Sequence, residues 1–366
     1  AIRTHPKCTH RCEIVPGMGL LKSFSDKKNP EPRYAATVFG DMTTPGGDAI
    51  DYACARLYRD QPNPLHVSPT VKYHHGGPDP LAGVSIYNAR SPRAHWHYIS
   101  YGFSDLYGAQ DAESESGYGF ELTFRLADES AMTGGNPPLW PVTMMQNLAR
   151  YVFETGNIFG QGHHFDANGP ITNDTGTRLR AVGFTLDPDL GEIETPYGRL
   201  AFLQILGLTT ADLSDAMAWQ GKKFFKLLMS TFPKGVTIMD RDSLRADPDL
   251  SLKIVDGQDR DGSNLGAAFL NALDFIDIPL TVVLERKAAQ DLRNFLSRRL
   301  PRGEAFTLLG PTKAIQFSLA SFDDVIINNE NFAQIQLSHD TFEGIQQELG
   351  NLTGDVQIGP ILWRVI

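Results

Sequence analysis

The stretch HWHYISYGF, residues 95–103, decides the fold of this chain. Aromatic and β-branched residues dominate it, and such residues favour a strand packed within a sheet. Runs of the same character lie nearby, separated by turn-forming Gly, Pro and Ser residues; they are TVKYHH (70–75), VSIYNAR (84–90) and GYGFELTFRL (117–126). Consecutive strands with short links are typical of a meander. The sequence therefore predicts a meander-like, mostly antiparallel sheet.

Amphipathic helices are predicted before and after these strands. Residues 48–59 place Ile50, Cys54 and Leu57 at helical spacing. Residues 140–156 form a second apolar helical face, with a proline near its start and a glycine at its end. We expect the second helix to cover the sheet.

The chain is long enough for two hydrophobic cores, because 366 residues exceed the size at which chains split into domains. Acidic residues and glycines cluster between Met239 and Asn264, which predicts a turn-rich linker. Further strand and helix patterns follow it. We predict an α/β fold of the α+β type, with a mostly antiparallel or mixed sheet flanked by helices in the first domain. The expected divisions are an N-terminal extension at 1–47 (partly disordered or vector-derived), a first domain at 48–272 and a smaller α+β domain at 279–366.

Composition narrows the class of partner. The net charge is −10, from 33 basic and 43 acidic residues. A nucleic-acid partner would require a basic face, so we predict that the chain binds no nucleic acid. No apolar run reaches the roughly 18 residues of a membrane span, so we expect no membrane contact. The first residues lack an apolar leader, and three cysteines cannot build a disulfide framework, so a cytoplasmic location is predicted. A basic protein partner is compatible with this charge.

Motifs for nucleotide cofactors and for serine nucleophiles are missing from the sequence, so we predict no cofactor. The carboxylates Asp187 and Asp189 lie in the text DPDL, which predicts an ordinary turn.

Histidines offer the one alternative to a non-catalytic protein. His95 and His97 are two residues apart and would face the same side of a strand, as two zinc ligands could. His163 and His164 could complete the set, which gives the alternative hypothesis of a metal-dependent enzyme. The competing interpretation is that these rings lie in a core strand and bond to buried backbone groups. Because nothing in the sequence fixes the four rings close together, we predict no metal.

The run from Asp48 to about Trp219 resembles the Suppressor of fused family. The resemblance rests on segments in the family's order and approximate spacing; they are LYRDQPNPL, KYHHGGPDPL, VSIYN, HWHYISYGFSDLYG, GYGFELTFRL, QNLARYVFETGN and TPYGRLAFLQILGLT. DGSNL at 261–265 resembles the end of the family's N-terminal domain, and LSRRLPRGEAFTLLG with AIQFSLASF resembles its C-terminal domain. The start of the chain is similar to that of bacterial members.

The resemblance implies a non-enzymatic binder of proteins. Animal members hold zinc-finger transcription factors, taking a short peptide as an added strand in a groove between their two domains. Added strands bind through backbone hydrogen bonds, and pockets for alternate side chains give specificity. Bacterial members are associated with polymorphic toxin systems as immunity proteins, or antitoxins. The resemblance thus implies a protein or peptide partner that this chain holds in its interdomain cleft, with a basic toxin as the bacterial form of that partner; the oligomeric state stays open.

The resemblance also indicates partner-binding residues. Tyr151 matches a tyrosine of the animal groove. At two further groove positions this chain departs from the animal acids, with His163 in place of an aspartate and Leu186 in place of a glutamate. The segment from Leu265 to Ala268 occupies the place of a groove edge. Because both acids are replaced, the resemblance does not carry over the animal ligand.

Overall fold

The computed structural model describes residues 34–36, 44–108, 114–172, 176–270, 273–277, 280–349 and 353–366. Backbone contacts divide these residues into two compact units. Unit 1 holds the described residues up to 213 together with 221–246, and unit 2 holds 214–220 together with the described residues from 247 to 366.

Unit 1 is built on one mixed sheet of nine strands in its described residues, in the order β1-β2-β3-β4-β5-β9-β7-β6, with β8 also paired to β9. The pairs are antiparallel except for β5 with β9. The strands are β1 (Tyr34–Ala36), β2 (Leu65–Pro69), β3 (Gly83–Ala89), β4 (His95–Tyr101), β5 (Glu115–Ala127), β6 (His164–Asp166), β7 (Leu179–Leu186), β8 (Glu192–Thr195) and β9 (Gly198–Thr209). The predicted antiparallel meander corresponds to β2 through β5.

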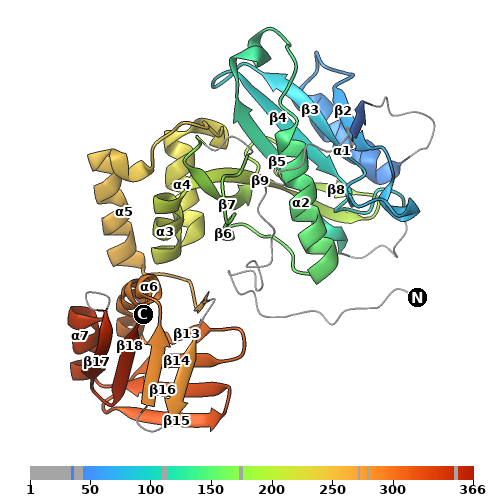
Figure 1. The fold of residues 1–366 in the computed structure, drawn as a ribbon. Helices are drawn as coiled ribbons and strands as arrows, with labels where there is room; N and C mark the ends of the chain where they lie inside the picture. The colour runs from blue at the N-terminus through green and yellow to red at the C-terminus, as the bar shows by residue number, and fades with distance from the viewer. Residues whose placement is uncertain are drawn as a thin grey trace. The chain divides into compact units, whose positions relative to one another are not determined.

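Helices cover both faces of this sheet (Figure 1). On one face α1 (Pro45–Leu57) buries Ile50 and Cys54 in a cluster with Ile99 of β4. On the opposite face α2 (Trp140–Thr155) places Trp140 edge-on to Phe124 of β5. These pairings follow the alternation of side chains along each strand. The helix α4 (Gly221–Thr231) packs against β7. The expected covering of the sheet by helices is confirmed.

Unit 2 contains two smaller sheets around a separate core. One has the order β10-β13-β14-β16-β15 and the other β11-β12-β18-β17. The strands are β10 (Ala267–Phe269), β11 (Asp274–Asp277), β12 (Leu280–Leu284), β13 (Phe306–Leu309), β14 (Ala314–Leu319), β15 (Asp324–Asn329), β16 (Phe332–Leu337), β17 (Gly354–Ile358) and β18 (Ile361–Val365). The helices are α5 (Pro248–Asp261), α6 (Arg286–Arg299) and α7 (His339–Glu348), while α3 (Thr210–Ala218) begins in unit 1 and ends in unit 2. A stack of Phe317 on Trp363 joins the two sheets in one core.

Several local predictions were wrong. Residues 70–75 do not form a strand; the strand lies earlier, at β2, and Tyr73–His75 form a short 3-10 turn. The acidic stretch predicted as a linker contains α5. Its N-cap Asp247 accepts hydrogen bonds from the N–H groups of Asp249 and Leu250, and Pro248 occupies the first turn, where a missing N–H costs nothing.

The division into units also falls earlier than the expected boundary at 272–279. Helix α5 belongs to unit 2 because Gly257 packs against Trp219, and Gln258 donates to the carboxylate of Asp215. Of the predicted extension at 1–47, the described part includes strand β1 and the start of α1 at Pro45, and the rest lies outside the described residues. In the described residues no helix has the length and apolar character that a membrane crossing needs.

Candidate functional site

Strand β4, which carries His95 and His97, lies at the centre of unit 1. His97 is completely buried there. The Tyr58 hydroxyl lies 2.7 Å from Nδ1 of His97, and Nε2 lies 3.2 Å from the Asp187 carboxylate. A neutral ring with its proton on Nε2 satisfies both contacts, accepting from Tyr58 and donating to Asp187. Burial, with the nearby Arg125 charge, lowers the pKa of His97 to about 4. The ring is therefore neutral at physiological pH.

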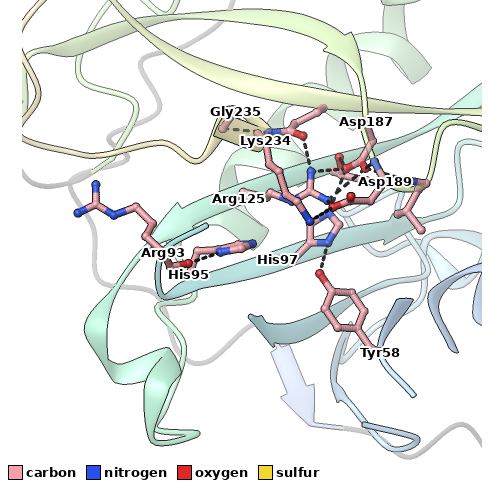
Figure 2. Close-up of polar contacts among 12 residues, drawn as sticks. Tyr58, Arg93, His95, His97, Arg125, Asp187, Asp189, Lys234 and Gly235 are labelled. Atoms are coloured by element: carbon pink, nitrogen blue, oxygen red, sulfur yellow. Dashed lines mark hydrogen bonds and ion pairs between the residues drawn. The ribbon is translucent and has the colours of Figure 1, made fainter. Parts of the chain in front are cut away.

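Arg125 carries the charge at the centre of this network (Figure 2). Its guanidinium donates to both oxygens of Asp187, at 2.8 and 3.2 Å, and to Asp189 at 2.9 Å. It also donates to the side-chain oxygen of Gln204 on β9. Burial alone would raise the pKa of Asp187, but the hydrogen bond from His97 and the charge of Arg125 hold it well below its usual range. The pair is therefore ionised.

The network runs from this buried pair to the surface through Asp189. Lys234, whose side chain is 37% exposed, lies 3.0 Å from Oδ2 of Asp189, the same oxygen that accepts from Arg125. The side chains of Arg125 and Asp187 themselves have no solvent exposure. A substrate could not reach them while the sheet stays folded, so the arrangement supports a structural role that ties β4, β5 and β9 to the turn after β7.

The four histidines of the alternative metal-enzyme hypothesis do not lie together. His95 and His97 lie on β4, whereas His164 lies on β6 and His163 directly precedes it. Three strands, β5, β9 and β7, separate β4 from β6 in the sheet, and neighbouring strands are about 4.8 Å apart. In the described residues no group of three or more potential ligands could hold a metal ion.

Three of the predicted partner-binding residues gather around Phe184 of β7. Tyr151 of α2 stacks on Phe159, which in turn stacks on Phe184 with ring centres 4.5 Å apart. The N–H of Phe184 donates to the backbone oxygen of His163. Leu186 is the last residue of β7 and lies on the same sheet face as Phe184 by alternation.

Tyr151 contributes a polar group to this aromatic cluster. Its hydroxyl accepts a hydrogen bond from the Asn157 side chain at 3.0 Å, while its ring is buried. The expected packing of α2 on the sheet and the expected groove position are therefore both compatible with its placement.

Strand β6, beside His163, is an edge of the nine-stranded sheet. The hydrogen bonds from Phe184 to His163 and from Ala167 to Arg180 fix which backbone groups face β7. In an antiparallel pair this orientation alternates along the strand. The N–H and C=O groups of His164 and Asp166 therefore point away from β7, where the described residues provide no further strand.

The other two predicted residues lie at a second sheet edge, in unit 2. Ala268 is part of β10, which among the described residues pairs with β13 alone, in parallel. Leu265 lies just before β10; its N–H donates to the Ser263 hydroxyl and its side chain is buried. Hydrogen bonds at Gly266 and Leu270 face β13, so the backbone groups of Ala267 face the other way. Both predicted groove segments thus adjoin sheet edges.

Sequence reasoning missed the charged centre of unit 1. Arg125 sits in the text ELTFRL, where Glu121 and Thr123 are also polar and buried, and Gln204 is the single polar residue of FLQILG. Polar residues within otherwise apolar strand text were the available signal, since buried polar groups need partners. The DPDL text does form a turn, as predicted, yet the same Asp187 that accepts from the backbone of Leu190 also pairs with Arg125.

Comparison with known proteins identifies a family that this chain matches. The family model described as Suppressor of fused protein matches residues 77–242. The human and mouse Suppressor of fused homologs are each 44% identical over 237 residues, which is 60% of this chain and 48% of theirs. The chain thus spans about half the length of these relatives.

Solved structures extend the comparison. The crystal structure of Drosophila Suppressor of Fused matches 91% of this chain and 98% of its own chain, with a TM-score of 0.73 and 23% identity, which bears on the fold alone. A chain of a Sufu–Fu complex is 35% identical, with a TM-score of 0.55 over 58% of this chain and 98% of that one.

Proposed function

Because the chain belongs to the Suppressor of fused family, we propose that it is a non-enzymatic protein-binding module that takes a partner's extended segment as an added strand. The observation that carries this proposal is the pair of sheet edges at β6 and β10. Each edge adjoins residues that the family resemblance indicates for partner binding, and strand addition needs such an edge. The crystallised Sufu–Fu complex supports a protein partner for a relative.

The contacts at β6 suit this mode of binding. His164 and Asp166 supply two outward N–H groups and two outward C=O groups, enough to pair with a short strand. Asp166 is exposed, whereas the aromatic cluster of Tyr151 and Phe159 behind the edge is already packed. A partner strand would therefore bind mainly through its backbone, with side-chain selection at His163 and Leu186.

For the partner we propose a basic polypeptide, and in the bacterial form of the family a toxin that this protein neutralises as an immunity protein in the cytoplasm. The net charge of −10 supports this choice, because complementary charge speeds association. The replacement of two groove acids by His163 and Leu186 argues for a ligand other than the animal peptide.

Two variants at one position test the mode of binding. Asp166→Pro removes an outward N–H that β7 does not use, whereas Asp166→Ala keeps that N–H and removes only the side chain. The partner would be recovered by co-purification with the wild-type chain from its native host, identified by mass spectrometry and titrated as a purified protein. We expect Asp166→Pro to weaken binding about tenfold or more and Asp166→Ala to have little effect.

Equal binding by both variants would exclude addition at β6. Repeated co-purification without any specific protein would contradict the protein-binding function itself. Growth of cells that produce the recovered partner, with and without this chain, separates an immunity role from other binding roles.

A further inference from the structure

The longest edge strand in the described residues is β15, with six residues, and it lies at the opposite end of its sheet from β10. Within the described part of the chain it pairs on one side, with β16. Natural edge strands are usually short or carry Lys or Pro, which discourage pairing with other chains. The text DVIINN contains neither. The register of β15 against β16 shifts between Ile327 and Asn329, so the regular part of this edge that is open to strand addition is residues 324–327.

Two large apolar side chains are exposed at this edge. Ile326 is 40% exposed, while its neighbours Val325 and Ile327 pack on the unit 2 core from the other face. Phe322, just before the strand, is 65% exposed. Burying side chains of this size is what gives binding sites their main anchors.

The loop that presents Phe322 is fixed in place. One carboxylate oxygen of Asp323 accepts the N–H of Ser338 at 2.6 Å, and the other accepts the Thr341 hydroxyl at 2.7 Å. These contacts tie the loop to the start of α7. A fixed loop loses less conformational entropy on binding, so the backbone that carries Phe322 is preorganised.

The charges beside β15 decide between two possible occupants of this edge, a second copy of the chain and a strand with basic ends. Asp324 begins β15 and Glu330 follows it, and neither forms an ion pair within the part of the chain that is described. Antiparallel pairing of β15 with a second copy about Ile326 would bring the acids at one end of each copy near those of the other. A strand flanked by Lys or Arg would instead meet these acids favourably.

We propose that β15 is a second protein-binding edge, which takes an extended segment whose apolar residues alternate and whose ends are basic. Its partner residues are Ile326 and Phe322 for the apolar side chains, and Asp324 and Glu330 for the basic ends. This surface is separate from β6 and β10, so the outcome of its test is independent of the proposed function.

The test uses the full chain and a fluorescein-labelled peptide, Lys-Thr-Val-Thr-Val-Thr-Lys, with a second peptide in which glutamate replaces both lysines. Binding is measured by fluorescence anisotropy, and the site is mapped by amide chemical shifts. Ile326→Lys protects the edge with a charge at an exposed position. Leu252→Lys is the matched control, because Leu252 of α5 is 63% exposed and lies outside β15.

We expect the basic peptide to bind, to shift amide signals within 324–329, and to bind about tenfold more weakly to Ile326→Lys but equally to Leu252→Lys. The acidic peptide should bind at least about tenfold more weakly than the basic one. No binding, shifts confined to other strands, equal binding by Ile326→Lys, or equal binding of the two peptides would overturn the proposal. Self-association of the free chain that Ile326→Lys abolishes would assign the edge to a second copy and overturn it as well.

Discussion

At the scale of single residues, unit 1 depends on a buried charge. Arg125 lies at the middle of a sheet with no solvent exposure, where an unpaired guanidinium would be very costly. Asp187, Asp189 and Gln204 together accept its hydrogen bonds. The network specifies which strands meet, because a shifted register would leave these groups without partners.

Removing one partner of Arg125 should therefore lower the free energy of unfolding far more than removing a surface ion pair does. We expect Asp187→Asn to lower the free energy of unfolding of unit 1 by about 3–5 kcal/mol, because it leaves Arg125 without its compensating charge. The control Glu115→Gln breaks the half-exposed pair with Arg199 and should cost less than about 1 kcal/mol. Urea unfolding followed by hydrogen exchange in β4 and β5 measures both, and equal effects would contradict the assigned role.

Buried histidines should make unit 1 sensitive to mild acid. Burial lowers the pKa values of His66, His95 and His97 to about 4 from an ordinary 6.5. Between these values the unfolded chain binds protons that the folded chain does not. Stability is therefore complete above pH 6.5 and declines as pH falls, by up to about 1.4 kcal/mol per pH unit for each histidine.

One carboxylate opposes this decline. Burial raises the pKa of Glu121 to about 7, so its folded form takes up a proton over the same range and offsets one histidine. Urea midpoints of unit 1 between pH 7.5 and 5 should still fall with pH, and less steeply in His66→Gln, whose side chain can keep a contact to Ser85. A flat profile would show that these rings are protonated in the folded chain.

At the scale of elements, α5 shows how one small residue sets the packing of a helix. A Cβ on Gly257 would lie 2.3 Å from the ring of Trp219. That ring is held by a hydrogen bond from its Nε1 to Asp261 at 2.8 Å, so it cannot move aside cheaply. The close approach is therefore reserved for glycine, although glycine weakens a helix by about 1 kcal/mol relative to alanine.

Gly257→Ala should consequently destabilise unit 2. The gain in helix propensity is about 1 kcal/mol, but forcing the helix away from Trp219 should cost more, for a net loss of about 1–3 kcal/mol. Asp256→Ala, at the exposed neighbouring position of the same helix, provides the matched control and should lose nothing. Urea unfolding followed by hydrogen exchange in α5 gives the measurement, and a more stable Gly257→Ala would refute the packing argument.

At the scale of the whole molecule, two cores are built separately. Unit 2 has its own cluster of buried residues around Phe317 and Trp363, and unit 1 buries a different set around its nine-stranded sheet. A chain organised in this way need not unfold in a single step.

We expect the two units to lose protection independently. In hydrogen exchange read by mass spectrometry, Asp187→Asn should speed exchange in β4, β5 and β9 and leave β14 and β16 unchanged. Gly257→Ala should do the reverse, with α5 and β14 affected and β4 unchanged. Loss of protection across both units in either variant would show a single cooperative structure.

The sequence by itself determined the fold class, the strands around HWHYISYGF and the helices at α1 and α2, because these depend on local periodicity and on the apolar residues that fill a sheet. Its family resemblance also identified the segments that proved to adjoin the edges β6 and β10. The residues named there for partner binding stay a prediction.

Only the tertiary structure decided where polar residues meet. His97, Arg125 and Asp187 come from strands and turns far apart in the chain, and sequence spacing does not encode their contact. Strand order also separates His95 from His164 by three strands, so the four histidines cannot form one metal site. Helix α5 forms despite its linker-like composition, because its N-cap and its contact with Trp219 stabilise it. Local patterns fix elements, but strand order fixes which side chains lie side by side, and the order is set by the burial of the whole sheet.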